Sequence, residues 1–196
     1  TTDTGNITLQ GTALDDDFGI YLGATGLSTN GGDITLIGYG TSYTGVFVYG
    51  GDLASHGGDI TIIGGSTSLA GVQISGSDID SAGGNISIYG EGAATGLIVS
   101  AAGISSGAGE ISLRGSGGGV GGSGVWIGQG SVVSATSGDV LIEGASTTYH
   151  GVFLNAGDVH TTSGDIAITG TGGAAGVSLF SGELASTSGD IHIAGL

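Results

Sequence analysis

The sequence predicts an all-β chain, folded as a single-stranded right-handed parallel β-helix (a β-solenoid) of about seven coils with three short strands per coil. Two observations predict it. A segment that begins with glycine and an acidic or amide residue returns every 25 to 29 residues, about 26 on average. Within each interval, aliphatic residues alternate with other residues in short runs bounded by glycine. This period of two is that of a strand with one buried face.

The first strand of each coil follows an acidic or amide residue and carries two aliphatic columns. The acidic or amide column is Asn6, Asp33, Asp59, Asn85, Glu110, Asp139, Asp165 and Asp190. The inward columns are Ile7, Ile34, Ile60, Ile86, Ile111, Val140, Ile166 and Ile191, and then Leu9, Leu36, Ile62, Ile88, Leu113, Ile142, Ile168 and Ile193. Because Asp and Asn at a corner accept hydrogen bonds from their own nearby amides, we expect the acidic column to be structural.

The second strand of each coil opens with a glycine and also carries two inward columns. These are Ile20, Val46, Val72, Leu97, Val125, Val152 and Val177, and then Leu22, Val48, Ile74, Val99, Ile127, Leu154 and Leu179. We expect the glycines at the corners to supply positive φ values and to permit close approach of the backbone.

The third strand follows five residues later and carries one inward column. The sequence predicts this column as Leu27, Leu53, Ile79, Ile104, Val132, Val159 and Leu184. Two residues further on, every copy has a hydroxyl, at Thr29, Ser55, Ser81, Ser106, Ser134, Thr161 and Ser186. We expect these hydroxyls to face inward and to hydrogen-bond the backbone.

The charge balance excludes one class of partner. Seventeen acidic side chains face one basic side chain, Arg114, and the formal net charge is −16. A chain with so few cations cannot neutralise phosphates, so we expect no nucleic-acid partner. No apolar run approaches the roughly 18 residues of a spanning helix, so we expect no membrane insertion. Cysteine is absent, which excludes disulfides and thiolate metal sites.

The outward positions of the second strand are unusually apolar. They form the column Tyr21, Phe47, Gln73, Ile98, Trp126, Phe153 and Ser178. Two residues further along the same face lie Tyr49 and Phe180. The candidate contact stripe therefore consists of Tyr21, Phe47, Tyr49, Ile98, Trp126, Phe153 and Phe180, for lateral packing, a partner or stacking on sugar rings. Scattered surface apolarity, or coverage by a neighbouring segment, is the alternative.

The sequence predicts no catalytic, cofactor-binding or metal-binding residues. The corners are short, lysine is absent, and the carboxylates recur without a distinguished pair, whereas glycoside hydrolysis needs two carboxylates in different environments. We therefore expect no enzymatic activity, and a polysaccharide-active enzyme is the least favoured alternative. A second acidic column, at Asp52, Asp78, Asp158 and Glu183, leaves Ca²⁺ as the one open cofactor, because stacked carboxylates repel each other.

Three phrases resemble repeats of large bacterial exoproteins. They are Gly-Gly-Asp-Ile-Thr-Leu-Ile-Gly at 31–38, Ser-Gly-Asp-Ile-Ala-Ile-Thr-Gly at 163–170 and Gly-Val-Phe-Val at 45–48. Similar repeats belong to the filamentous-haemagglutinin-like adhesins of two-partner secretion and to related autotransporter passengers. The resemblance extends over essentially the whole chain. It implies a secreted rod at the bacterial cell surface, with a structural or adhesive role in an adhesin or filament, and carries over no functional residue.

We expect residues 1–196 to form one β-helix domain. The first strand occurs eight times and the other two occur seven times, which predicts an excerpt of a longer repeat array or a filament subunit. The expected partners are adjoining repeats or other protein subunits, including a homopolymer, and surface glycans. A carbohydrate-binding β-helix module that uses the outward aromatics is the alternative to the structural or adhesive rod.

Overall fold

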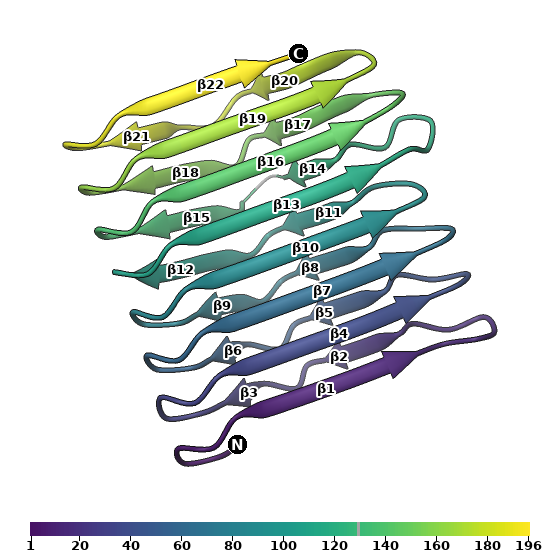
Figure 1. The fold of residues 1–196 in the computed structure, drawn as a ribbon, viewed down its shortest axis with the longest axis vertical. Coiled ribbons are helices and arrows are strands. Elements are labelled where there is room, and N and C mark those ends of the chain that lie inside the picture. The colour runs from purple at the N-terminus through teal and green to yellow at the C-terminus, as the bar shows by residue number, and fades with distance from the viewer. Residues whose placement is uncertain (129) are drawn as a thin grey trace.

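The computed structural model describes residues 1–128 and 130–196 and confirms the predicted fold. In this part of the chain every regular element is a strand, and each strand pairs in parallel with its equivalents in the neighbouring coils. In Figure 1 the chain crosses the front from left to right, returns behind and rises by one coil, which makes the β-helix right-handed. No helix of the described residues is long and apolar enough to cross a membrane.

The strands form three sheets, here called A, B and C. Sheet A, at the front of Figure 1, contains β1 (Ile7–Thr12), β4 (Ile34–Gly40), β7 (Ile60–Ser66), β10 (Ile86–Gly92), β13 (Ile111–Gly117), β16 (Val140–Ser146), β19 (Ile166–Gly172) and β22 (Ile191–Gly195). Sheet B contains β2 (Ile20–Gly23), β5 (Val46–Tyr49), β8 (Val72–Ser75), β11 (Leu97–Ser100), β14 (Val125–Ile127), β17 (His150–Asn155) and β20 (Ala175–Phe180). Sheet C contains β3 (Leu27–Ser28), β6 (Leu53–Ala54), β9 (Asp78–Asp80), β12 (Gly103–Gly107), β15 (Val132–Ala135), β18 (Asp158–Thr161) and β21 (Leu184–Ser186).

The inward side chains of the three sheets form one continuous core. The strands pair in the register that the aliphatic columns predict, so that Ile62, for example, lies between Leu36 and Ile88. These three side chains are fully buried. Each coil therefore covers the apolar side chains of the coil beside it, as expected of a solenoid whose repeats contact only their neighbours.

The third strand of the fifth coil departs from the prediction by one residue. Val133, and not Val132, pairs with Ile104 and is fully buried, and Ala135, and not Ser134, takes the inward place in the hydroxyl column. Val133 follows Ile127, the last residue of strand β14, by six positions. In every other coil the equivalent residue follows by five positions. The extra residue shifts the alternation of strand β15, and because two valines are adjacent, the aliphatic pattern did not reveal the shift.

The remaining hydroxyls of this column face inward and bond the backbone as predicted. Ser81 Oγ donates to the Gly84 carbonyl at 2.5 Å, and Ser106 Oγ donates to the Gly109 carbonyl at 2.5 Å. Thr2 makes the same contact with Gly5 ahead of the first coil, and its amide donates to the Ser28 carbonyl at 3.0 Å. Residues 1–5 therefore belong to a partial copy of the repeat, which the sequence reading missed.

Side chains of the acidic or amide column accept hydrogen bonds from backbone amides, as predicted. The amides belong to the next coil, however, whereas the sequence predicted amides of the same segment. The Asp33 amide donates to Asn6 Oδ1 at 2.8 Å, and the Asp59 amide donates to Asp33 Oδ1 at 2.9 Å. The Asn85 amide donates to Asp59 Oδ1 at 2.7 Å, and the Glu110 amide donates to Asn85 Oδ1 at 2.9 Å. We call this the corner ladder. A second ladder precedes sheet C, where the Asp52 and Asp158 carboxylates accept from the amides of Asp78 and Glu183.

The glycines between sheets A and B are required by close approach of the backbone. A Cβ atom on Gly144 would lie 2.0 Å from the Gly151 carbonyl oxygen, and one on Gly90 would lie 2.1 Å from the Gly96 carbonyl oxygen. Positive φ values recur between sheets B and C, in the column Ala24, Gly50, Gly76, Ala101, Gly130, Ala156 and Ser181, and also between sheets C and A, at Gly31, Gly57 and Gly83. The corner between sheets C and A combines both predicted uses of glycine, since Gly83 has a positive φ value and a Cβ atom on Gly84 would lie 2.1 Å from the Gly58 carbonyl oxygen.

Candidate functional site

The predicted contact stripe lies on the outward face of sheet B. One column of this face pairs from coil to coil in the order Tyr21, Phe47, Gln73, Ile98, Trp126, Phe153 and Ser178. Tyr49 and Phe180 lie in the adjacent outward column. All seven predicted side chains thus share one face, and Gln73 separates them into two groups.

Five aromatic side chains form a cluster at the N-terminal end of this face. We call it the N-terminal aromatic cluster; it consists of Phe18, Tyr21, Tyr43, Phe47 and Tyr49, whose contacting ring centroids are 5.0 to 5.7 Å apart. Phe18 contacts three of the other rings. Sequence reading missed Phe18 and Tyr43, which belong to the connection between sheets A and B. Their signal is an aromatic residue placed one or two positions before the glycine that opens the second strand.

Three residues of the other group, Ile98, Trp126 and Phe153, line a shallow hollow. We call it the Trp126 hollow; its lining is Thr95, Ile98, Gly121, Ser123, Trp126, Tyr149, Phe153 and Asn155. The indole of Trp126 lies over Gly128, where a Cβ atom would be only 3.0 Å from Cζ2. The Tyr149 ring meets the Phe153 ring edge to face, at a centroid distance of 6.1 Å. Three strands of sheet B, β11, β14 and β17, and the connections before them therefore build this hollow.

His150 lies beside the Trp126 hollow in an apolar setting. Its ring centroid is 3.9 Å from that of Tyr149 and 4.9 Å from that of Phe153. Its Nδ1 atom is buried and has no hydrogen-bond partner among residues 1–128 and 130–196. Burial lowers the pKa of His150 below its usual value of 6.5, because the apolar surroundings disfavour the charged imidazolium.

Acidification should therefore weaken the fold through His150. The unfolded chain takes up the proton near pH 6.5, but the folded chain takes it up only at lower pH, so this contribution to stability is complete above pH 6.5 and declines below it. Urea unfolding at pH 7.5, 6.0 and 5.0 should show a smaller loss for His150→Gln than for the unmodified chain. His160→Gln, on the outward face of sheet C, is the control. An identical pH dependence in all three proteins would contradict the prediction.

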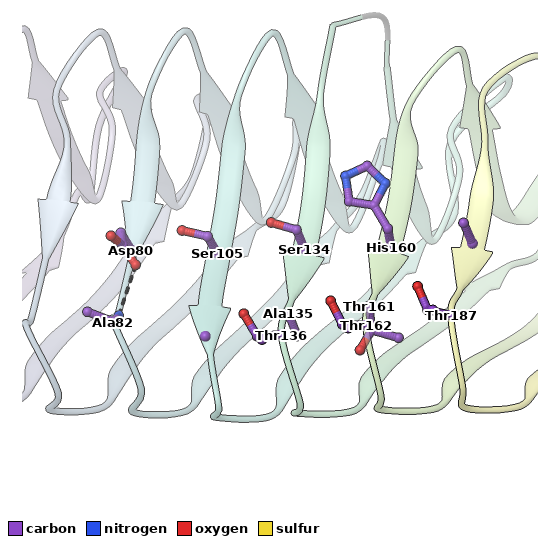
Figure 2. Close-up of a pocket in the computed structure, with 12 residues that line it drawn as sticks. Asp80, Ala82, Ser105, Ser134, Ala135, Thr136, His160, Thr161, Thr162 and Thr187 are labelled. Carbon is purple, nitrogen blue, oxygen red and sulfur yellow. Dashed lines mark hydrogen bonds between the residues drawn. The ribbon is translucent and has the colours of Figure 1, made fainter.

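Sheet C carries a second hollow, shown in Figure 2, which sequence reading did not identify. One row of outward side chains consists of Asp80, Ser105, Ser134 and His160, and a second row consists of Thr136, Thr162 and Thr187. The Asp80 carboxylate accepts a hydrogen bond from the Ala82 amide at 2.9 Å. His160 lies three coils from Asp80. At about 4.8 Å per coil the two groups are too far apart to share a proton.

Charged groups also border a hollow on sheet A, lined by Asn85, Ile86, Ser87, Tyr89, Glu110, Ser112 and Arg114. Arg114 Nε lies 2.9 Å from Glu143 Oε2 in an exposed ion pair. Burial raises the pKa of the Tyr89 phenol, and the Glu91 charge raises it further. Over residues 1–128 and 130–196, no three His, Asp or Glu side chains lie together in a way that could hold a metal ion. Ca²⁺ binding stays a prediction.

Comparisons of this chain with models of protein families, with curated proteins and with solved structures found no match.

Proposed function

We propose that the chain is a structural and adhesive β-helical rod, and that the outward face of sheet B is its contact surface. The contact stripe carries this proposal. Five of the seven residues in the main outward column of sheet B are aromatic or large aliphatic, and all five belong to the stripe. The equivalent column of sheet C is small or polar, at Ser28, Ala54, Asp80, Ser105, Ser134, His160 and Ala185. Single exposed apolar residues are ordinary on protein surfaces, whereas contiguous ones mark interaction sites.

The resemblance to filamentous-haemagglutinin-like repeats supports the cellular setting that we propose. In that setting the rod is secreted, stands at the bacterial cell surface, and forms part of an adhesin or filament. Its partners are adjoining repeats, other protein subunits or surface glycans. We also propose that it is not an enzyme, because the carboxylates of the two corners accept backbone hydrogen bonds and Arg114 is paired with Glu143.

Carbohydrate binding is the second candidate function. It is favoured by the indole of Trp126, which lies against the sheet with Phe153 beside it in the next coil. Aromatic rings held in this way are suited to stacking against the apolar face of a sugar. Release of products from neutral or acidic polysaccharides would instead favour a polysaccharide-active enzyme.

A pair of matched double variants tests the contact surface. Tyr21→Ser with Tyr49→Ser removes two exposed rings from sheet B, and Tyr39→Ser with Tyr89→Ser removes two rings of similar exposure from sheet A. Microspheres coated with each protein are tested for adhesion to bacterial and epithelial cells and to one another. We expect the sheet B variant to lose adhesion about fivefold or more, since aromatic anchors dominate interface energies. Equal behaviour of the two variants, or no adhesion by the unmodified chain, would contradict the proposal.

A further inference from the structure

The floor of the Trp126 hollow is aromatic, and Gly128 leaves space for the indole ring. A Cβ atom on Gly128 would lie 3.0 to 3.4 Å from three atoms of the indole, so glycine at this position lets the ring lie against sheet B. Phe153 is the register partner of Trp126 in the next coil. The two side chains therefore adjoin along the rod, about 4.8 Å apart at the backbone. A flat ligand can rest on both.

The Trp126 hollow is also uncharged, which distinguishes it in a chain of net charge −16. The hollow on sheet C includes Asp80 and His160, and the hollow on sheet A includes Glu110 and Arg114. The imidazole of His150, next to the Trp126 hollow, is neutral at pH 7 because burial lowers its pKa. An anionic ligand would find no cation in this hollow, and the field of the whole molecule would repel it. A cationic ligand would find no carboxylate there.

The polar groups of the lining suit a ligand rich in hydroxyls. The Asn155 amide both donates and accepts hydrogen bonds, and so do the hydroxyls of Thr95 and Ser123. A few such groups around an apolar floor are the usual composition of a small-molecule site. We infer that the Trp126 hollow is a binding subsite for a neutral oligosaccharide, with a pyranose ring on Trp126 and Phe153. This inference rests on the proposed contact role of sheet B and gives part of that surface a defined ligand class.

The fluorescence of Trp126 provides a direct measurement, because the chain contains one tryptophan. The full chain is titrated with two neutral probes, cellohexaose and maltohexaose, and with hexagalacturonate as an anionic probe of equal length. We expect at least one neutral probe to change the emission saturably and hexagalacturonate to leave it unchanged. Saturable binding of hexagalacturonate with equal affinity would overturn the assignment of a neutral ligand.

Three variants locate the binding. Phe153→Ala and Asn155→Ala should each weaken binding of the neutral probe about tenfold, since each removes one contact with the sugar. Tyr39→Ala removes an exposed ring from sheet A, outside the contact surface, and should leave the affinity unchanged. Calorimetry with Trp126→Ala provides a measurement that does not depend on the indole, and we expect loss of detectable binding. Circular dichroism confirms that each variant remains folded.

The outcomes separate this inference from the proposed function. If neither neutral probe binds, or if the Phe153 and Asn155 variants bind as tightly as the Tyr39 variant, the sugar subsite is wrong. In that case, a sheet B variant that still loses adhesion leaves the contact surface standing. If the neutral probe binds at this hollow but the sheet B variant adheres normally, the sugar subsite stands and the adhesive role is wrong.

Discussion

Replacing Gly144 with alanine is expected to lower the free energy of unfolding by about 3 kcal/mol or more, at the upper end of the range for overpacking. The new Cβ atom would lie 2.0 Å from the Gly151 carbonyl oxygen and 2.5 Å from its carbonyl carbon. Both are backbone atoms at a buried corner, so no flexible side chain can move to relieve the contact. Strand β16 would have to separate from the start of β17. Urea denaturation followed by circular dichroism measures the loss.

Gly118→Ala is the matched control for Gly144→Ala. A Cβ atom on Gly118 would meet its nearest atoms, Thr147 Oγ1 and the Ala93 carbonyl oxygen, at 3.7 and 3.8 Å, which are ordinary contact distances. Because alanine restricts the unfolded chain, this variant should be as stable as the unmodified protein or more stable by up to about 1 kcal/mol. Similar destabilisation of both variants would show that close approach is not the reason for glycine at position 144.

Asp59→Ala is expected to lower the free energy of unfolding by about 1 kcal/mol, the usual net value of one hydrogen bond. It removes the acceptor that holds the Asn85 amide at 2.7 Å in the corner ladder. Asp59→Asn should leave stability unchanged, because Asn6 and Asn85 already accept such bonds through Oδ1. The same urea titrations compare the two variants.

The control for the corner ladder separates the hydrogen bond from the charge. Asp16→Ala also removes one negative charge, and no hydrogen bond of the Asp16 side chain occurs in the described part of the chain. We expect it to leave the urea midpoint within about 0.5 kcal/mol of the unmodified protein, as for most surface changes. Equal losses for Asp59→Asn and Asp59→Ala would mean that the carboxylate charge, and not the acceptor oxygen, holds the corner.

The fold could be predicted from the sequence because the residues that determine it recur at equivalent positions of each coil. Aliphatic residues recur at the inward positions of all coils, and their period identifies both the strands and the coil. The one error in register, at Val132 and Val133, arose where two aliphatic residues are adjacent and an extra residue precedes them. Burial distinguishes the two valines, and burial depends on the neighbouring coils rather than on the residue type.

The candidate site was predicted only in outline. Alternation was enough to place Tyr21, Trp126 and Phe153 on one outward face. It could not predict that Phe18 would pack among the rings of the next coil, because Phe18 lies in a connection without a period. Nor could it predict the orientation of the Trp126 ring, which depends on the space over Gly128. The hydrogen bonds of the corner ladder were predicted within one segment for a related reason. An Asp or Asn that accepts from a nearby amide and one that accepts from an amide of the next coil look alike in the sequence.

The parallel pairing of every coil with the next has a mechanical consequence. The strands cross the long axis of the rod (Figure 1), so tension applied along that axis pulls on the hydrogen bonds between coils in series. Coils then detach one at a time, and each frees about 26 residues, which extend to about 90 Å at roughly 3.4 Å per residue. Stretching such a rod yields a succession of similar lengthenings, and the coils still stacked keep their surfaces intact.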